Sequence, residues 1–190
     1  MDILIEVSAK HVHLSPQDIE ALFGKGAALT VKRELSTPGY YVCSEKVQVQ
    51  GPKGMMTMGI LGPPRKKTQV EVSMSDAIRL GITPPLRESG DLKDSAGVVI
   101  TGPCGQIRLK EGVIIAKRHI HLTPEEAARM GLKDSQTVDV KADGERKVVF
   151  GETIVRTDPS YVFPSMHIDT DEANAAGIKD NTVGNIMNEV

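Results

Sequence analysis

Short runs of alternating hydrophobic and polar residues recur along the chain and predict many short β-strands. Three β-hairpins are predicted, in KVQVQGPKGMMTMGI, GVVITGPCGQIRL and TVDVKADGERKVVF. Each segment places two such runs around a turn, and the first two turns share the sequence Gly-Pro-x-Gly. Short strands with frequent turns are typical of small barrels or sandwiches. We therefore expect a mainly β protein.

A second pattern occurs four times and predicts four short helices. Each copy has a predicted strand, a capping residue, about two turns of helical sequence and a glycine that ends the helix. The four copies are HLSPQDIEALFG, EVSMSDAIRLGIT, HLTPEEAARMG and HIDTDEANAAGIKD. Their capping residues are Ser15, Ser73, Thr123 and Asp169. An acidic residue follows each cap three places later, where it favours the first helical turn.

The residue two positions before each cap is of a type that binds metals. These residues are His13, Glu71, His121 and His167. In a strand, residues i and i+2 face the same side, so His11 is predicted to pair with His13 and His119 with His121. A lone His-x-His is usually an ordinary strand, and a strand glutamate such as Glu71 can face solvent. The matched positions, however, account for all five histidines of the chain.

Six candidate ligands would oversupply one tetrahedral ion and favour two ions with open positions. Imidazole suits zinc, copper, iron, cobalt or nickel, and we expect zinc. Spacing does not assign each histidine to an ion. The copies pair as one with two and three with four. This pairing predicts two similar domains, 1–110 and 111–190, with TPPLRESGDLKDSAG as a connecting loop.

Composition narrows the classes of partner. A net charge of -2 and 3% aromatic residues argue against a nucleic-acid partner. No apolar stretch is long enough to cross a membrane, and the start of the chain lacks the features of a secretory signal. Cys43 and Cys104 form no Cys-x-x-Cys pair and are expected to be free thiols. We expect a cytoplasmic protein.

The chain has no nucleophile elbow, no Walker loop and no dinucleotide-binding glycine motif. If all five histidines bind metal, none remains as the base of a Ser-His or Cys-His pair. The chemistry is therefore expected to come from the metal and its neighbours.

Several long segments resemble the PduL-type phosphate acyltransferases, also called phosphate propanoyltransferases or phosphotransacylases. The segments are VSAKHVHLS, LGPPRKKTQVEVS, SGDLKDSAG, KEGVIIAKRHIHLTPEEA and MHIDTDEANAA. The resemblance implies two small β-barrel domains with short helices and a site for two zinc ions at their junction. It places the metal ligands on the six residues that the repeats select, and a phosphate-contacting arginine on Arg65.

The resemblance also implies the reaction acyl-CoA + phosphate = acyl phosphate + CoA, with a propanoyl or acetyl group and coenzyme A as a substrate. Phosphate would bind at an open metal position, with Arg65 on its other oxygens, and attack the thioester directly. Two alternatives stay open on the residues alone. One is a dimetal phosphoesterase, and the other is a binding module whose metal ions are purely structural.

The family further implies small-molecule partners and a role in propanediol degradation. Barrels built from repeats often pair, so we expect a homo-oligomer. Some members carry an amino-terminal extension that targets them to bacterial microcompartments. This chain begins almost directly at its first predicted strand. Residence in a microcompartment, or contact with its shell, is therefore expected only if such an extension is missing here.

Overall fold

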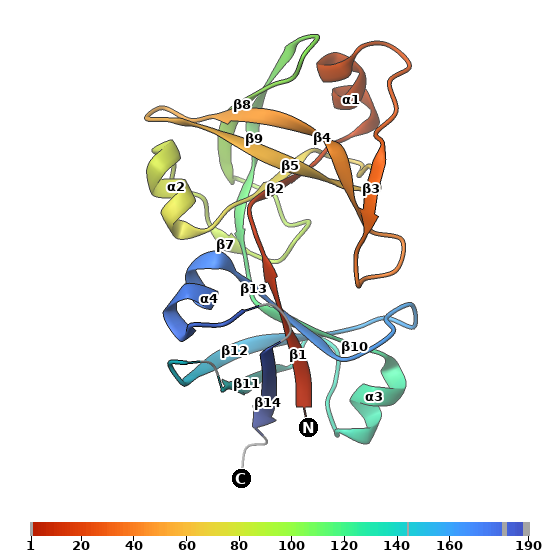
Figure 1. Cartoon of the computed structure of the whole chain (residues 1–190), viewed down its shortest axis with the longest axis vertical. Coiled ribbons are helices and arrows are strands. Elements are labelled where there is room, and N and C mark those ends of the chain that lie inside the picture. Colours follow the sequence, from red (N-terminus) through yellow and green to blue (C-terminus); the bar gives the residue numbers. More distant parts are fainter. Residues whose placement is uncertain (1, 144, 180–181, 188–190) are drawn as a thin grey trace. The chain divides into compact units, whose positions relative to one another are not determined.

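The computed structural model describes residues 2–143, 145–179 and 182–187, and this part of the chain is mainly β with four short helices (Figure 1). The chain divides into two compact units. The first, here called the discontinuous unit, consists of Met1–Ala9 with Lys117–Val190. The second, the continuous unit, is Lys10–Ala116. Each unit contains its own β-barrel.

The continuous unit is a closed barrel of six strands. Its strands are β2 (His11–His13), β4 (Tyr41–Gln50), β5 (Met55–Gly62), β6 (Gln69–Glu71), β8 (Ala96–Thr101) and β9 (Gln106–Ala116). The ring runs β2–β5–β4–β8–β9–β6 and closes where β6 pairs with β2. Two short strands extend it, β3 (Val31–Glu34) beside β4 and β7 (Leu86–Arg87) beside β9.

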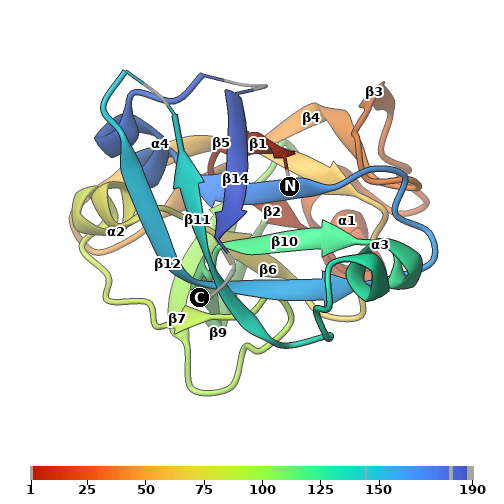
Figure 2. The same ribbon diagram turned by 90° about the horizontal axis from the view of Figure 1, so that it is seen from below.

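The discontinuous unit is a second closed barrel of six strands, seen from below in Figure 2. Its ring runs β1–β13–β10–β12–β11–β14. The strands are β1 (Asp2–Ser8), β10 (His119–Leu122), β11 (Thr137–Ala142), β12 (Val148–Thr157), β13 (Ser165–Asp169) and β14 (Thr182–Met187). The predicted hairpins are confirmed as β4–β5, β8–β9 and β11–β12, although Gly144 in the last turn lies outside the described residues.

The two barrels share one order of parallel and antiparallel neighbours. Strand β2 is parallel to β5 and antiparallel to β6, as β10 is parallel to β12 and antiparallel to β13. Strand β6 is parallel to β9, as β13 is parallel to β1. Strand β1 is therefore the counterpart of β9. Each half of the chain, β1–β8 and β9–β14, therefore contributes its first strand to one barrel and its other barrel strands to the other.

This exchange of first strands makes the observed units differ from the predicted domains, 1–110 and 111–190. Residues 1–9 belong with the second half of the chain because β1 pairs with β13 and β14, for example Leu4 with Ser165. At the other boundary, β9 stays in the continuous barrel through Ala116. Its Val113 pairs with β6 and β8 and is fully buried.

Each barrel encloses its own apolar core. The core of the continuous unit includes Val12, Leu22, Ile60, Val70 and Ile100, and that of the discontinuous unit includes Ile5, Ile120, Leu122, Val155 and Met166. Val12 and Ile120 are the middle residues of the two His-x-His segments, and both are fully buried. Because side chains alternate along a strand, the histidines lie on the opposite face from the core.

The four predicted helices are confirmed as α1 (Pro16–Phe23), α2 (Met74–Leu80), α3 (Pro124–Arg129) and α4 (Thr170–Ala176). Each predicted cap has extended backbone, and its side chain accepts a hydrogen bond from the backbone N–H three residues later. The helices are six to eight residues long. We found no helix in the described ranges that is long and apolar enough to cross a membrane.

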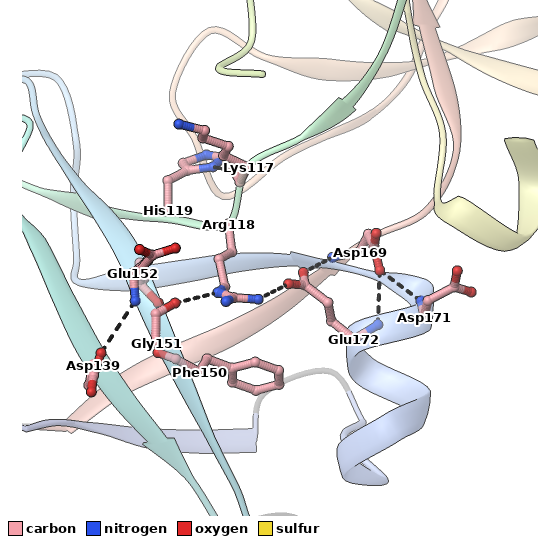
Figure 3. A network of polar contacts seen from close by, with 11 residues as sticks. Lys117, Arg118, His119, Asp139, Phe150, Gly151, Glu152, Asp169, Asp171 and Glu172 are labelled. Atoms are coloured by element: carbon pink, nitrogen blue, oxygen red, sulfur yellow. Dashed lines mark hydrogen bonds and ion pairs between the residues drawn. The ribbon is translucent and has the colours of Figure 1, made fainter. Parts of the chain in front are cut away.

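An ion pair ties α4 to the segment that enters β10 (Figure 3). The Arg118 Nη1 lies 2.6 Å from the Glu172 Oε1, and the Arg118 Nε donates to the Gly151 carbonyl at 2.8 Å. The guanidinium also lies 5.7 Å from the centroid of the Phe150 ring. In the continuous unit, Lys10 and Asp76 form the equivalent pair at 3.3 Å. Both pairs hold the residue just before a His-x-His segment.

Candidate metal centre

His11, His13 and Glu71 form a compact cluster in the continuous unit. Strands β2 and β6 position them, since His11 is directly opposite Glu71 in the antiparallel register. The His11 Nε2 lies 3.5 Å from the Glu71 Oε2, and the two imidazole centroids are 5.0 Å apart. One potential ligand atom from each residue lies within 4.8 Å of the others. Both histidines are buried.

The ring of His13 is oriented for metal binding. Its Nδ1 lies 3.1 Å from the Leu61 carbonyl oxygen, a contact that requires the proton on Nδ1 and leaves the lone pair of Nε2 for a ligand bond. Burial, with smaller contributions from His11 and Arg65, lowers the pKa of His13 to about 2. The imidazole is therefore neutral near pH 7, which is the form that binds a metal.

Arg65 lies beside this cluster. It follows β5 in the Gly-Pro-Pro turn, and its backbone N–H donates to the Leu14 carbonyl at 2.9 Å. The Arg65 Nη1 donates to the Ser89 hydroxyl at 2.9 Å, and that hydroxyl lies 2.8 Å from the Glu71 Oε1. Arg65 is partly exposed, whereas Lys66 and Lys67 on the same turn are exposed. The Ser89 side chain thus links the cation of Arg65 to the candidate metal ligand Glu71.

His119, His121 and His167 form a second cluster in the discontinuous unit. His119 is directly opposite His167 in the β10–β13 register. The ring centroids are 4.9 Å apart for His119 and His121, 5.2 Å for His119 and His167, and 4.4 Å for His121 and His167. The His119 Nδ1 lies 2.9 Å from the Lys117 carbonyl oxygen, which again leaves Nε2 for a ligand bond (Figure 3).

The second cluster is looser than the first. In the described part of the chain, His11, His13 and Glu71 are the one group of three or more histidine, cysteine or acidic side chains whose ligand atoms all lie within 4.8 Å. Burial is the main cause that lowers the pKa of His121 to about 3 and that of His119 well below its ordinary value. Both imidazoles are therefore neutral as well.

Three further residues contact or face this second cluster, and the sequence analysis did not identify them. Tyr161 stacks on His121 with a centroid distance of 4.0 Å. Arg156 is opposite His121 in the β10–β12 register, and its charge further lowers the pKa of His119. The Glu6 Oε2 lies 3.3 Å from the His167 Nε2. The register explains this last contact, since Glu6 on β1 is directly opposite His167 on β13.

The donor set of the first cluster fits a divalent metal. Two imidazoles and one carboxylate are ligands that zinc and related ions use, with a fourth position left for water or substrate. The second cluster supplies three imidazoles. The structure thus places three of the six predicted ligands in each unit. That the two clusters act together at one junction, as the resemblance implies, stays a prediction.

Comparisons with known proteins show the family of this chain. The family model described as phosphate propanoyltransferase matches residues 4–179. A protein named phosphate propanoyltransferase from Listeria monocytogenes is 46% identical over 184 residues, which are 96% of this chain and 86% of the relative. A protein of the same name from Thermotoga maritima is 48% identical, over 92% of this chain and 83% of the relative. The chain therefore belongs to the phosphate propanoyltransferase family.

Proposed function

We propose that this chain exchanges a short acyl group, propanoyl or acetyl, between coenzyme A and inorganic phosphate. The names of its relatives support this reaction class. One observation of the site supports phosphate as the second substrate. Arg65 holds a partly exposed guanidinium beside two buried imidazoles and a partly buried carboxylate.

In the proposed reaction, an oxygen of phosphate attacks the carbonyl carbon of the thioester. A carbon–oxygen bond forms, the carbon–sulfur bond breaks, and its electron pair leaves on the thiolate of coenzyme A. Arg65 would bind phosphate through its planar fork of N–H donors, which matches the spacing of phosphate oxygens. Its contact with Ser89 uses one of five donors, so the side chain can stay anchored while it binds.

The side chains of the first cluster would hold a divalent metal in a defined orientation. The contact of His13 with Leu61 fixes one imidazole, and the Glu71 Oε2 lies 3.5 Å from the Nε2 of the other imidazole, His11. When bound, such an ion would supply Lewis-acid polarisation of the thioester carbonyl or orient phosphate for attack. We infer zinc as the ion because the donors are two imidazoles and one carboxylate.

Direct attack, without an acyl-enzyme, fits the state of Cys43 and of the histidines. Cys43 is buried, and burial together with the charge of Glu45 raises its pKa to about 11. Its thiol is therefore protonated near neutral pH and is a poor nucleophile. All five histidines belong to the two clusters.

The cysteines give a prediction that also sets the background of any thiol assay. A chromogenic thiol reagent is expected to modify one cysteine per native chain, Cys104, because Cys104 is exposed and Cys43 is buried. After denaturation it is expected to modify two. Absorbance at the end point measures both numbers. Two rapidly reacting thiols in the native protein would contradict the burial of Cys43.

Replacing Arg65 by alanine tests whether this residue binds phosphate, as the proposed function requires. We expect the KM for phosphate to rise about 10- to 100-fold, because hydrogen bonds to a charged group contribute roughly 1.5–3 kcal/mol. The KM for acyl-CoA is expected to change little. Initial rates of thiol release, measured against phosphate concentration at saturating acyl-CoA, give the comparison.

Lys66 provides the matched control for this experiment. It is the next residue of the same turn, carries the same charge and is exposed. Lys66→Ala is expected to keep the wild-type KM for phosphate. An Arg65→Ala protein that saturates with phosphate as the wild type does would show that Arg65 does not bind it. An equal rise of the KM for phosphate in both variants would show that Arg65 contributes only its positive charge and no specific contact.

A further inference from the structure

The hydroxyl of Ser89 lies between a guanidinium and a carboxylate. The Arg65 Nη1 is 2.9 Å from the Ser89 Oγ, and the Ser89 Oγ is 2.8 Å from the Glu71 Oε1. Arginine can only donate a hydrogen bond and an ionised carboxylate can only accept one. The Ser89 proton must therefore point to Glu71, while the oxygen of Ser89 accepts from Arg65.

Gln69 fixes the same carboxylate oxygen from a second side. The backbone N–H of Gly90 donates to the Gln69 Oε1 at 2.8 Å, so the side-chain amide has only one consistent orientation. Its Nε2 then donates to the Glu71 Oε1 at 2.5 Å and to the Ser89 Oγ at 2.9 Å. Gln69 is 1% exposed. Gly90 has a φ of 102°, which few side chains tolerate and which allows this approach of the loop.

The two oxygens of Glu71 are therefore used differently. Oε1 accepts from Ser89 and Gln69, whereas Oε2 lies 3.5 Å from the His11 Nε2, among the candidate ligand atoms. This division favours a carboxylate that binds a metal through Oε2 alone. Hydrogen bonds from outside the ligand set commonly fix ligands in this way.

Without the hydroxyl, the cation and the carboxylate would attract each other directly. Arginine and glutamate form paired, two-pronged contacts when nothing separates them. Such a contact would occupy the guanidinium fork that phosphate needs and would turn Glu71 away from the metal position.

We propose that Ser89 is a positioning residue that keeps Arg65 and Glu71 apart. It holds the guanidinium ready for an anionic substrate and fixes Glu71 as a ligand through a single oxygen. The part that concerns phosphate rests on the proposed function, whereas the part that concerns the metal does not.

Ser89→Ala tests both parts. We expect the affinity of the first cluster for zinc to fall about 10- to 100-fold, as is usual when a partner of a ligand is removed. The KM for phosphate is expected to rise about tenfold, since Arg65 is then drawn to Glu71. Competition with a chromophoric chelator measures the zinc affinity without any turnover, and phosphate titration of thiol release measures the KM. Ser89→Thr keeps the hydroxyl and is expected to restore both values.

Ser95 gives a matched control in the same loop. It is buried, donates to the Leu92 carbonyl at 2.7 Å and accepts from the backbone N–H of Gly112 at 2.8 Å. Ser95→Ala is expected to lower the thermal midpoint by a few degrees and to leave zinc affinity and the KM for phosphate unchanged. If Ser95→Ala changes both as much as Ser89→Ala does, loop stability explains the effect and the proposal fails.

A double-mutant cycle assigns the loss of metal affinity to Glu71. In a Glu71→Gln background, Ser89→Ala is expected to cause little further loss of zinc affinity, because the ligand that Ser89 positions is already gone. Additive losses would contradict the proposal, as would wild-type zinc affinity in Ser89→Ala alone. If the wild-type protein shows no reaction with phosphate, the proposed function fails. The zinc measurements then decide the role of Ser89 by themselves.

Discussion

Replacing His13 by asparagine is expected to lower phosphate-dependent thiol release about 10³-fold or more. The Lewis-acid contribution of a metal is worth several kcal/mol, and each 1.36 kcal/mol is a factor of ten in rate. Asparagine keeps a polar side chain of similar reach but lacks the Nε2 that the contact with Leu61 directs to the cluster. Metal analysis of the purified variant is expected to show about one ion per chain fewer than the wild type.

A chelation experiment separates loss of the metal from damage to the fold. Wild-type protein stripped of metal is expected to lose activity to the same extent and to regain it when zinc is added back. His13→Asn is expected to stay inactive under the same reloading. Wild-type rates in His13→Asn, with one ion missing, would show that the first cluster is not part of the reaction.

Replacing Arg118 by alanine is expected to lower the free energy of unfolding by about 2 kcal/mol. Breaking a buried ion pair costs roughly 3–5 kcal/mol, and the effect is smaller here because the side chains of Arg118 and Glu172 are 31% and 22% exposed. Burial already raises the pKa of Glu172 while Arg118 is present, and removing the arginine leaves this carboxyl without its cation. Urea unfolding followed by circular dichroism gives the free energy.

An exposed ion pair in the same unit controls for surface charge. Lys147 lies 3.8 Å from Asp143 and is 73% exposed, so Lys147→Ala is expected to change the free energy by less than about 0.5 kcal/mol. A loss of similar size in both variants would contradict a specific role for the Arg118 pair. So would an Arg118→Ala protein as stable as the wild type.

The helices could be predicted because their signals are local. A capping residue, an acidic residue three places later and a terminating glycine act within about ten residues, and each cap makes its expected bond. The candidate ligand positions followed from the same repeats. In a short strand, the spacing of His11 and His13 brings the two rings together whatever the rest of the chain does.

The exchange of the first strands could not be predicted in this way. The segment ILIEV predicts a strand because it is short, apolar and rich in β-branched residues, but such a run does not say which sheet the strand joins. The partners of β1 are residues 165–169 and 182–185, more than 150 positions away. The contact of Glu6 with His167 was missed for the same reason, since it exists only in that register.

Two residues hydrogen-bond to Glu71, and the sequence could have indicated only one of them. Gln69 is two residues before Glu71 on the same strand, so the rule that paired the histidines places it on the same face. Ser89 lies in the segment expected to be a connecting loop, and only the folded chain brings its hydroxyl to Glu71. Loops often carry functional residues that strand and helix patterns do not reveal.

The most direct measurement of the central claim is thiol release from propanoyl-CoA or acetyl-CoA by purified protein of known metal content, with and without inorganic phosphate. We predict release that requires phosphate, yields one acyl phosphate per thiol and stops when the metal is chelated. Release without phosphate would identify a thioesterase instead. No release by fully loaded protein would contradict the proposed transfer and leave both histidine clusters with a structural role.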